Sequence, residues 1–406
     1  MKSYILFLSA LLLLGAPPIS SHAEENGEYL LSEKLYQPLQ EIQKLMDENK
    51  YPEARTKLAE LLTRDLSNYE KAVLNQTLGY IYNAMEQYSE ALDAFVTSLE
   101  FGALPDDVTL NLTYIIAQLY AQQGDLKQSR DYLETWLNKT PRPGVDAHIF
   151  AATVYYQLEE YADMVPHLKQ ALRTSEDPEN YWYEMLFVAY YELEQYENAS
   201  NTLVNMIKRF PEKSDYLLYL ANTYLQADNN RKAIAVYELA DKKNLLTEIE
   251  IKQLVNLYLV ENIPHKAALF LEEKLGKNFI PRSRENLDLL ANSWIRSNED
   301  DKALQVLNDI AQMSGDPDVY LRIGQIYFKQ HRWEKAQAAL EEANNIDDNT
   351  KNARANLLLG IAAYHNEQVA ISNKALNKAS TNESTKQQAE WWLAKLNRKI
   401  ENASKN

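Results

Sequence analysis

Cysteine is absent from the 406-residue sequence. Its absence excludes disulfide bonds, thiolate metal sites and cysteine nucleophiles, and it also excludes a lipid anchor attached through an N-terminal cysteine. Glycine and proline are scarce, with 10 and 13 residues respectively. All-β architectures need many turns, so this scarcity disfavours them and favours long helices joined by short loops.

Basic residues are outnumbered, with 42 Lys and Arg against 58 Asp and Glu and a formal net charge of −16. A charge of this sign repels phosphate backbones, so nucleic-acid binding is not expected. It also disfavours peripheral binding to anionic lipid. Two interpretations of the acidic surplus remain: a solvated acidic surface, or an acidic groove that accepts a basic segment of a partner.

Long apolar runs are also missing, apart from one short run near the start. The apolar stretch 4–14 follows Lys2, and Ser21 and Ala23 supply small residues at the −3 and −1 positions of a cleavage site. The run is too short to cross a bilayer, which needs about 20 apolar residues. These features predict a secretory signal peptide over residues 1–23, cleaved after Ala23. Export of a chain without cysteine predicts a periplasmic protein.

The rest of the chain contains a tandem pattern. An aromatic residue recurs at one position of each unit, at Tyr82, Tyr120, Tyr155, Tyr190, Tyr224, Tyr258, Trp294 and Tyr327. A small residue, replaced once by Met, recurs at a second position, at Ala54, Ala91, Ser129, Met164, Ala199, Ala233, Ala267, Ala303 and Ala336. Successive members of the second series are 33 to 38 residues apart. A period near 34 predicts tandem pairs of antiparallel helices.

The residue types explain how such helix pairs pack. A small residue at Gly79, Ala221, Ala291 or Gly324 lets the first helix approach its partner closely, and the aromatic residue one turn later packs between helices. One pair cannot bury its apolar face alone, so neighbouring pairs stack and supply the core.

This pattern resembles the tetratricopeptide-repeat family over nearly the whole chain after the signal peptide. The resemblance implies an all-α, right-handed superhelical solenoid of about nine to ten helix-turn-helix repeats. We expect a short lead-in at 24–35, the repeat array at 36–380, and a capping helix with a tail at 381–406. The exposed ends of such an array, with Trp391 and Trp392 near one of them, also predict a capacity for self-association.

Two segments look like a narrower group of proteins. The stretch from Leu99 to Gly124, which contains Phe-Gly-Ala-Leu-Pro, and the stretch Glu261–Ala268 are similar to periplasmic tetratricopeptide-repeat proteins that accompany TonB–ExbB–ExbD energy-transduction systems. The resemblance implies a scaffold that binds envelope proteins, with TonB, ExbB or ExbD as partner. The alternative is an adaptor in outer-membrane assembly, secretion or polysaccharide export.

Motifs of catalysis are not found. The six histidines are dispersed without the spacing of a zinc site, and neither a glycine-rich phosphate loop nor a GxSxG motif occurs. We therefore expect no catalytic residue, no cofactor and no metal, and we do not expect an enzyme. An enzyme of cell-wall or polymer metabolism built on the same frame is the alternative from a different class.

The resemblance also implies where a partner binds. In the tetratricopeptide-repeat family the first helix of each unit lines the inner surface of the superhelix. The position after the small site should face inward, and it is occupied by Tyr80, Gln118, Thr153, Val188, Asn222, Asn256, Asn292 and Gln325. Five of these eight are amides, and a ladder of amides can hold the backbone of an extended peptide. The alternative is a wet polar face without a ligand.

Aromatic residues dominate this face in the earlier units. Tyrosine is enriched at interaction hot spots, so they predict a protein contact surface, with packing between repeats as the alternative. The predicted partner-binding groove combines the two kinds of residue: Tyr80, Tyr114, Gln118, Phe150, Tyr156, Tyr191, Asn222, Asn256, Asn292 and Gln325.

Overall fold

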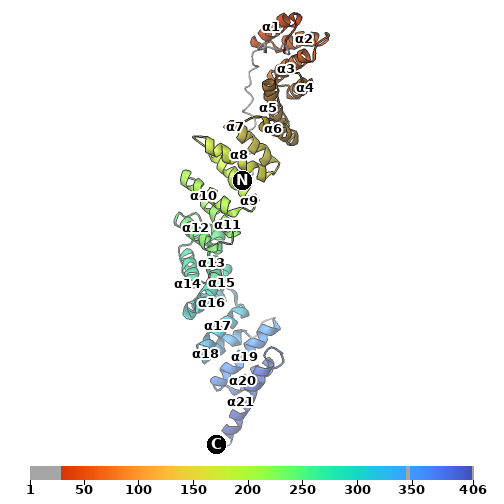
Figure 1. The fold of residues 1–406 in the computed structure, drawn as a ribbon. Coiled ribbons are helices and arrows are strands. Elements are labelled where there is room, and N and C mark those ends of the chain that lie inside the picture. Colours follow the sequence, from red (N-terminus) through yellow and green to blue (C-terminus); the bar gives the residue numbers. More distant parts are fainter. Residues whose placement is uncertain (1–28, 344–347, 405–406) are drawn as a thin grey trace. The chain divides into compact units, whose positions relative to one another are not determined.

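The computed structural model describes residues 29–343 and 348–404, which form 21 α-helices and no β-strand (Figure 1). The predicted signal peptide, residues 1–23, lies outside the described residues. The contacts between residues divide the chain into two compact units, the first ending at Lys213 and the second beginning at Ser214.

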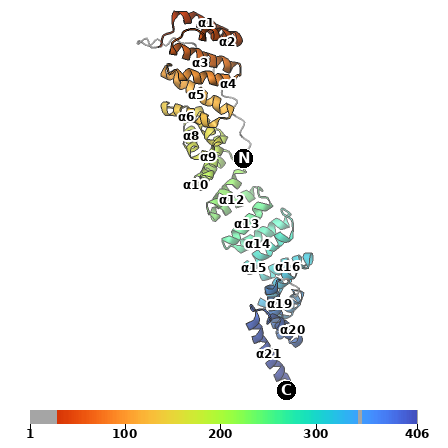
Figure 2. The same cartoon turned by 90° about the vertical axis from the view of Figure 1, so that its right-hand side faces the viewer.

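The first unit contains five helix pairs. Each odd-numbered helix packs against the even-numbered helix that follows, and each even-numbered helix up to α8 also packs against the next odd-numbered one (Figure 2). The helices are α1 Glu33–Asp47, α2 Tyr51–Leu62, α3 Asn68–Ala84, α4 Tyr88–Glu100, α5 Asp106–Gln123, α6 Leu126–Lys139, α7 Val145–Gln157, α8 Tyr161–Thr174, α9 Asn180–Glu192 and α10 Tyr196–Arg209.

The second unit contains five more pairs and a final helix, stacked in the same order. The helices are α11 Tyr216–Gln226, α12 Asn230–Lys242, α13 Glu248–Val260, α14 Pro264–Gly276, α15 Arg284–Arg296, α16 Asp300–Ser314, α17 Pro317–Lys329, α18 Trp333–Glu342, α19 Asn349–His365, α20 Val369–Ala379 and α21 Lys386–Ser404. The predicted all-α class and the tandem array of helix pairs are thus confirmed.

The small residue of each even-numbered helix lies where two helices nearly touch. All nine predicted residues, from Ala54 to Ala336, have an exposed fraction of 0%. The tenth pair has Ser372 at this place, a position that the sequence pattern did not reveal, and its hydroxyl donates to the Gly360 carbonyl at 2.8 Å. The Ser129 hydroxyl donates in the same way to the Ala117 carbonyl at 2.7 Å. The hydroxyl of a serine at this position therefore satisfies its hydrogen bond without widening the gap.

Close approach also explains the small residue of the odd-numbered helices. A Cβ atom added to Gly79 would lie 2.4 Å from the Phe95 ring, and one added to Gly324 would lie 2.6 Å from Leu340 Cγ. In both pairs the contacting side chain is 16 residues further along the chain and has no exposed surface. These two glycines therefore permit a contact that any side chain would block.

The repeated aromatic residue marks the last turn of each odd-numbered helix from α3 to α17. The Tyr82 carbonyl accepts from the Gln87 amide at 2.9 Å, and the Tyr190 carbonyl accepts from the Gln195 amide at 2.8 Å. A 6→1 bond of this kind is half of a Schellman motif, and the residue inside the loop adopts a left-handed conformation. That residue is Glu86, with φ of 58°, in the first of these turns.

Replacing Glu86 by glycine is expected to stabilise the first unit by about 1 kcal/mol, because an L-residue with a side chain is strained at positive φ and glycine is not. Urea unfolding of the two proteins measures the difference. Asn262 has φ of 57° in the corresponding turn of the second unit. Because asparagine tolerates this conformation, Asn262→Gly should have a smaller effect. A loss of stability in Glu86→Gly would contradict the assignment of strain to this turn.

The final helix is held on the second unit by aromatic and cationic side chains. Lys395 Nζ of α21 lies 5.2 Å from the centroid of the Tyr364 ring of α19, and the Trp392 ring of α21 meets the Tyr364 ring with centroids 5.3 Å apart. Trp333 and His365 stack nearby with centroids 4.3 Å apart. Trp391 keeps 59% of its surface exposed. The capacity for self-association stays a prediction.

Candidate functional site

Three of the predicted amides line an exposed face of the second unit. Asn222 on α11, Asn256 on α13 and Asn292 on α15 are exposed, and Gln325 on α17 is half-buried. Asn222 Oδ1 accepts from the Tyr237 hydroxyl at 2.7 Å, and Asn292 Oδ1 accepts from an Arg322 guanidinium nitrogen at 2.8 Å. Asn256 makes no side-chain hydrogen bond with any residue that the structure describes. Free amide donors on α11, α13 and α15 therefore remain for a ligand.

A shallow hollow of about 340 Å³ follows the same face of α13. Its lining residues are Ile249, Lys252, Gln253, Asn256, Leu257 and Val260. Ile249 and Val260 are 73% and 69% exposed. The two ends of α13 therefore offer apolar side chains to a partner, and its middle offers an amide.

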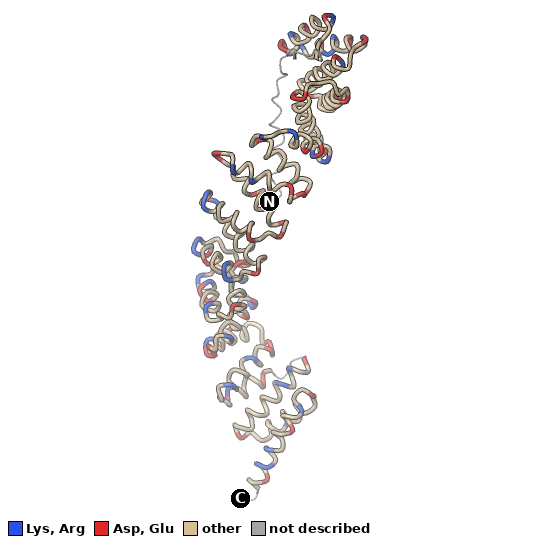
Figure 3. The backbone as a smooth tube through the Cα atoms, in the orientation of Figure 1, with Lys and Arg blue, Asp and Glu red and all other residues tan. Residues whose placement is uncertain are grey.

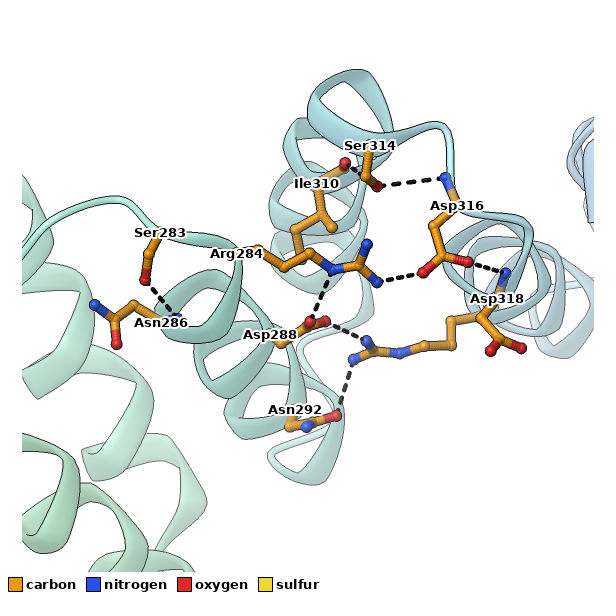
Figure 4. Close-up of polar contacts among 10 residues, drawn as sticks. Ser283, Arg284, Asn286, Asp288, Asn292, Ile310, Ser314, Asp316 and Asp318 are labelled. Atoms are coloured by element: carbon orange, nitrogen blue, oxygen red, sulfur yellow. Dashed lines mark hydrogen bonds and ion pairs between the residues drawn. The ribbon is translucent and has the colours of Figure 1, made fainter.

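Ion pairs join the odd-numbered helices along this side of the second unit. Arg284 of α15 lies between Asp288 and Asp316 (Figure 4). Arg322 of α17 contacts Asp288 at 2.8 Å. Each of these side chains is at least a quarter exposed, so each pair contributes at most about 1 kcal/mol. Their main effect is to neutralise the charges on α15 and α17.

The charge of Lys252 is also neutralised within the chain, because its ammonium group contacts Glu248 at 3.1 Å and Glu285 at 3.0 Å. Similarly, Lys351 of α19 contacts Asp318 of α17 at 3.0 Å. Because these ammonium groups have partners within the chain, they do not form a clamp for a partner's carboxylate.

Three predicted groove residues of the first unit are packed inside. Tyr80 and Gln118 are 6% exposed and Phe150 is 7% exposed. The Tyr80 ring meets the Phe95 ring edge to face, with centroids 5.1 Å apart. These three side chains therefore lie in the packing between helices of the first unit. Thr153 and Val188, at the same repeat position as Tyr80 and Gln118, are half-buried.

The remaining predicted residues of the first unit are half-buried. Tyr114 lies against Trp136 and Phe150, with ring centroids 4.4 and 5.8 Å away, and burial raises its pKa to about 12. Tyr156 and Tyr191 lie at the ends of α7 and α9. Of the ten predicted residues, six belong to the first unit and four to the second.

Two of the histidines that are far apart in the sequence lie side by side in the structure. His148 on α7 and His167 on α8 place their Nδ1 atoms 3.0 Å apart, so one ring donates and the other accepts. The Tyr155 ring stacks on His167, with centroids 5.6 Å apart, and its hydroxyl donates to Glu134 at 3.1 Å. Burial and the neighbouring His148 lower the pKa of His167 to about 4, and burial lowers the pKa of His148.

This histidine pair lacks further ligands for a metal ion. Among the described residues, no group of three or more His, Cys, Asp or Glu side chains is placed to hold one. No sequence signal marks the pair, because 19 residues separate its members and only the folding of one helix on the other joins them. Within the described ranges, no helix has the length and apolar character needed to span a membrane.

The net negative charge of the chain comes almost entirely from the first unit. Residues up to Lys213 include 17 Lys and Arg against 32 Asp and Glu, a net charge of −15. From Ser214 onward there are 25 against 26, a net charge of −1. Basic and acidic positions both occur along this unit (Figure 3). The two units therefore present different electrostatic surfaces to partners.

Comparison with known proteins supports the tetratricopeptide-repeat family. Residues 184–244 and 296–361 each match a family model described as tetratricopeptide repeat. The chain is also similar to the TPR repeat-containing protein YpiA of Bacillus subtilis (strain 168), with 28% identity over 163 residues. This match covers 40% of the chain and 37% of YpiA, so the chain spans little more than a third of that relative's length.

Solved structures with a similar arrangement of helices are distant in sequence. A tetratricopeptide repeat protein of Parabacteroides merdae is 16% identical, with a TM-score of 0.36, over 64% of this chain and 99% of that one. The TPR2AB domain of yeast Sti1, solved in a complex with pHSP90, is 17% identical, with a TM-score of 0.32, over 62% and 98%. Sequence identities and TM-scores this low imply nothing about the ligands of this chain.

Proposed function

We propose that this chain is an exported periplasmic scaffold that binds envelope proteins, as an accessory component of a TonB-type energy-transduction system. Tetratricopeptide repeats form extended binding surfaces for other proteins, which supports the scaffold role. The signal-like segment 1–23 supports export, and the resemblance of Leu99–Gly124 and Glu261–Ala268 supports the TonB system. The alternative role is an adaptor in outer-membrane assembly, secretion or polysaccharide export.

The observation that carries the binding role is the exposed face on α11, α13 and α15. Three amides lie on consecutive odd-numbered helices, and Asn256 lies in a hollow with exposed apolar side chains at its two ends. An extended peptide needs this combination, because the amides bond its backbone and the apolar groups take its side chains. The charges beside the hollow are already paired, so binding there depends on shape and hydrogen bonds.

Site-specific crosslinking in the native envelope tests this proposal. A photoreactive amino acid at Asn256 is expected to capture a protein that the same group at Glu272, an exposed residue of α14, does not capture. Recovery of TonB, ExbB or ExbD supports the energy-transduction role. Recovery of assembly or export proteins instead rejects that role and supports the alternative. Equal products at both positions would reject the α13 face as a binding site.

Replacement of Asn256 by alanine is expected to weaken capture of the same protein by about tenfold, since a lost pair of amide hydrogen bonds costs about 1 to 1.5 kcal/mol. For this comparison the photoreactive amino acid is placed at Gln253 of the same helix, because position 256 carries the alanine substitution. Glu272→Ala serves as the control and should leave capture unchanged. Equal capture by the Asn256→Ala protein would show that this amide does not contact the partner.

A further inference from the structure

The second unit places its own cations on the repeated aromatic rings. Lys232 lies over Tyr224 at 5.2 Å, Lys266 over Tyr258 at 5.1 Å and Lys302 over Trp294 at 4.1 Å, measured from Nζ to the ring centroid. Lys335 occupies the equivalent place beside Tyr327 at 5.8 Å. Each lysine directly precedes the small residue of its even-numbered helix. The ends of the odd-numbered helices are therefore built to accept an ammonium group.

The first unit has the repeated aromatic rings but no lysine at the position that holds one in the second unit. The residue before the small position is acidic or an amide in all five pairs: Glu53, Glu90, Gln128, Asp163 and Asn198. The four equivalent rings have no Lys or Arg over them in the part of the first unit that the structure describes: Tyr82, Tyr120, Tyr155 and Tyr190. A cation that the second unit supplies internally is thus missing from the first, whose net charge is −15.

Additional tyrosines surround two of these places. The segments Tyr155–Tyr161 and Tyr190–Tyr196 both read Tyr-Tyr-x-Leu-Glu-x-Tyr and form the turns after α7 and α9. Their outer rings pair edge to face, Tyr156 with Tyr161 at 6.3 Å and Tyr191 with Tyr196 at 5.6 Å between centroids. The hydroxyls of these four tyrosines make no hydrogen bond with any residue in the described ranges. They are half-buried, so ring edges and hydroxyls stay accessible.

Carboxylates lie among these rings without counterions. Glu159, Glu192 and Glu194 form no ion pair with any described residue, whereas nearby Glu160 is neutralised by Arg130 at 2.6 Å. Burial raises the pKa of Tyr161, and the carboxylates of Glu192 and Glu159 raise it further. Because Glu192 belongs to α9 and Tyr161 to α8, the two neighbouring turns make one continuous surface. We call it the turn surface: Tyr156, Glu159, Tyr161, Tyr191, Glu192, Glu194 and Tyr196.

We propose that the turn surface binds a lysine- or arginine-bearing segment of a protein partner, whose cations take the place that lysines occupy in the second unit. The rings attract the cation through their faces, and the unpaired carboxylates supply charge-assisted hydrogen bonds. This site lies in the first unit and does not depend on the amide face around Asn256.

A single lysine introduced into the first unit should occupy the site and compete with the partner's cation. Asn198→Lys extends the lysine series of the second unit into α10 and places an ammonium group at Tyr190. Asn201→Lys adds the same charge to another exposed position of α10. The probe is a fluorescent ten-residue peptide of alternating Lys and Gly, with a Glu and Gly peptide as the negative control, and anisotropy with the full chain measures binding at low and at about 150 mM salt.

The chain is expected to bind the lysine peptide and not the glutamate peptide. Asn198→Lys should weaken binding by about tenfold or more, and Asn201→Lys by less than about threefold. Equal weakening by both variants would show that only bulk charge acts and would overturn the proposal. Failure of the chain to bind the lysine peptide at either salt concentration would overturn it as well.

Removal of the carboxylates provides a second test that does not add a charge to α10. The triple variant Glu159→Gln, Glu192→Gln, Glu194→Gln is compared with Glu53→Gln, Glu60→Gln, Asp65→Gln, which removes the same charge from exposed positions in and just after α2. The first should lose about tenfold in affinity and the second much less. Equal losses would contradict a defined site, while circular dichroism confirms that both variants are folded.

Discussion

Gly324→Ala is expected to destabilise the second unit by about 1 to 3 kcal/mol, because the new methyl group would overlap Leu340, which has no room to move. The added Cβ would lie 2.6 Å from Leu340 Cγ, and Leu340 is fully buried between helices. The two helices of the pair must separate to relieve the clash. The loss of stability should therefore be largest in α17 and α18 and should reach their neighbours through the stacked core.

Hydrogen exchange, read separately for each helix pair, is the suitable measurement, since repeat arrays do not always unfold in one step. Gly276→Ala is the matched control, because an atom added at this last residue of α14 meets nothing within 4 Å. That variant should be neutral or stabilised by up to about 1 kcal/mol, as alanine is the better helix former. Equal stability of the two variants would refute the role of Gly324 in close packing.

Acidification from pH 7 to about 4.5 is expected to weaken the α7–α8 pair by about 1 to 2 kcal/mol, because the His167 ring is partly exposed and solvent screens part of the effect of its lowered pKa. The pKa of His167 is about 4 in the folded protein, below the ordinary value of 6.5. Between these two values the unfolded chain binds a proton that the folded chain does not. The stabilisation is therefore complete above about pH 6.5 and is lost as the pH falls toward 4.

The physical cause is the contact between His148 and His167, whose Nδ1 atoms lie 3.0 Å apart in a partly buried setting. One neutral ring can donate to the other, but two charged rings repel. Replacement of His167 by asparagine keeps a polar group near His148 and removes the larger of the two pKa shifts. The opening free energy of α7 and α8, obtained from hydrogen exchange after correction for the pH dependence of the intrinsic exchange rate, should then depend much less on pH over this range. His265→Asn, at an exposed histidine, is the control and should keep the dependence. An unchanged slope in His167→Asn would assign the effect to other groups.

Much of the fold is readable in the sequence because the repeat constrains residue size at each contact. The nine residues of the second series, eight small ones and Met164, were predicted from spacing alone, and all of them are completely buried. The aromatic series, from Tyr82 to Tyr327, was predicted as a packing element. Its place in the last helical turn, where the carbonyl closes a Schellman motif, became visible only with the backbone hydrogen bonds.

The binding face was less predictable. The same repeat position is buried at Tyr80 and Gln118 and exposed at Asn222 and Asn256. Exposure depends on which neighbouring helix covers the position, and a period in the sequence does not contain that information. Lysines 232, 266, 302 and 335 each follow the repeated aromatic residue of their unit by eight positions in the sequence. That each lysine lies over that ring is visible only in the structure.

The sequence by itself determined the helical class, the pairing of helices along the chain, the absence of thiol chemistry and the acidic surplus, because composition and local spacing suffice for each. The tertiary structure decided the rest: that His148 meets His167, that the odd-numbered helices of the second unit expose a row of amides, and that the rings of the first unit lack the cations of the second. Each of these depends on side chains from different helices meeting in space, and such meetings follow from packing between helices and not from any one segment.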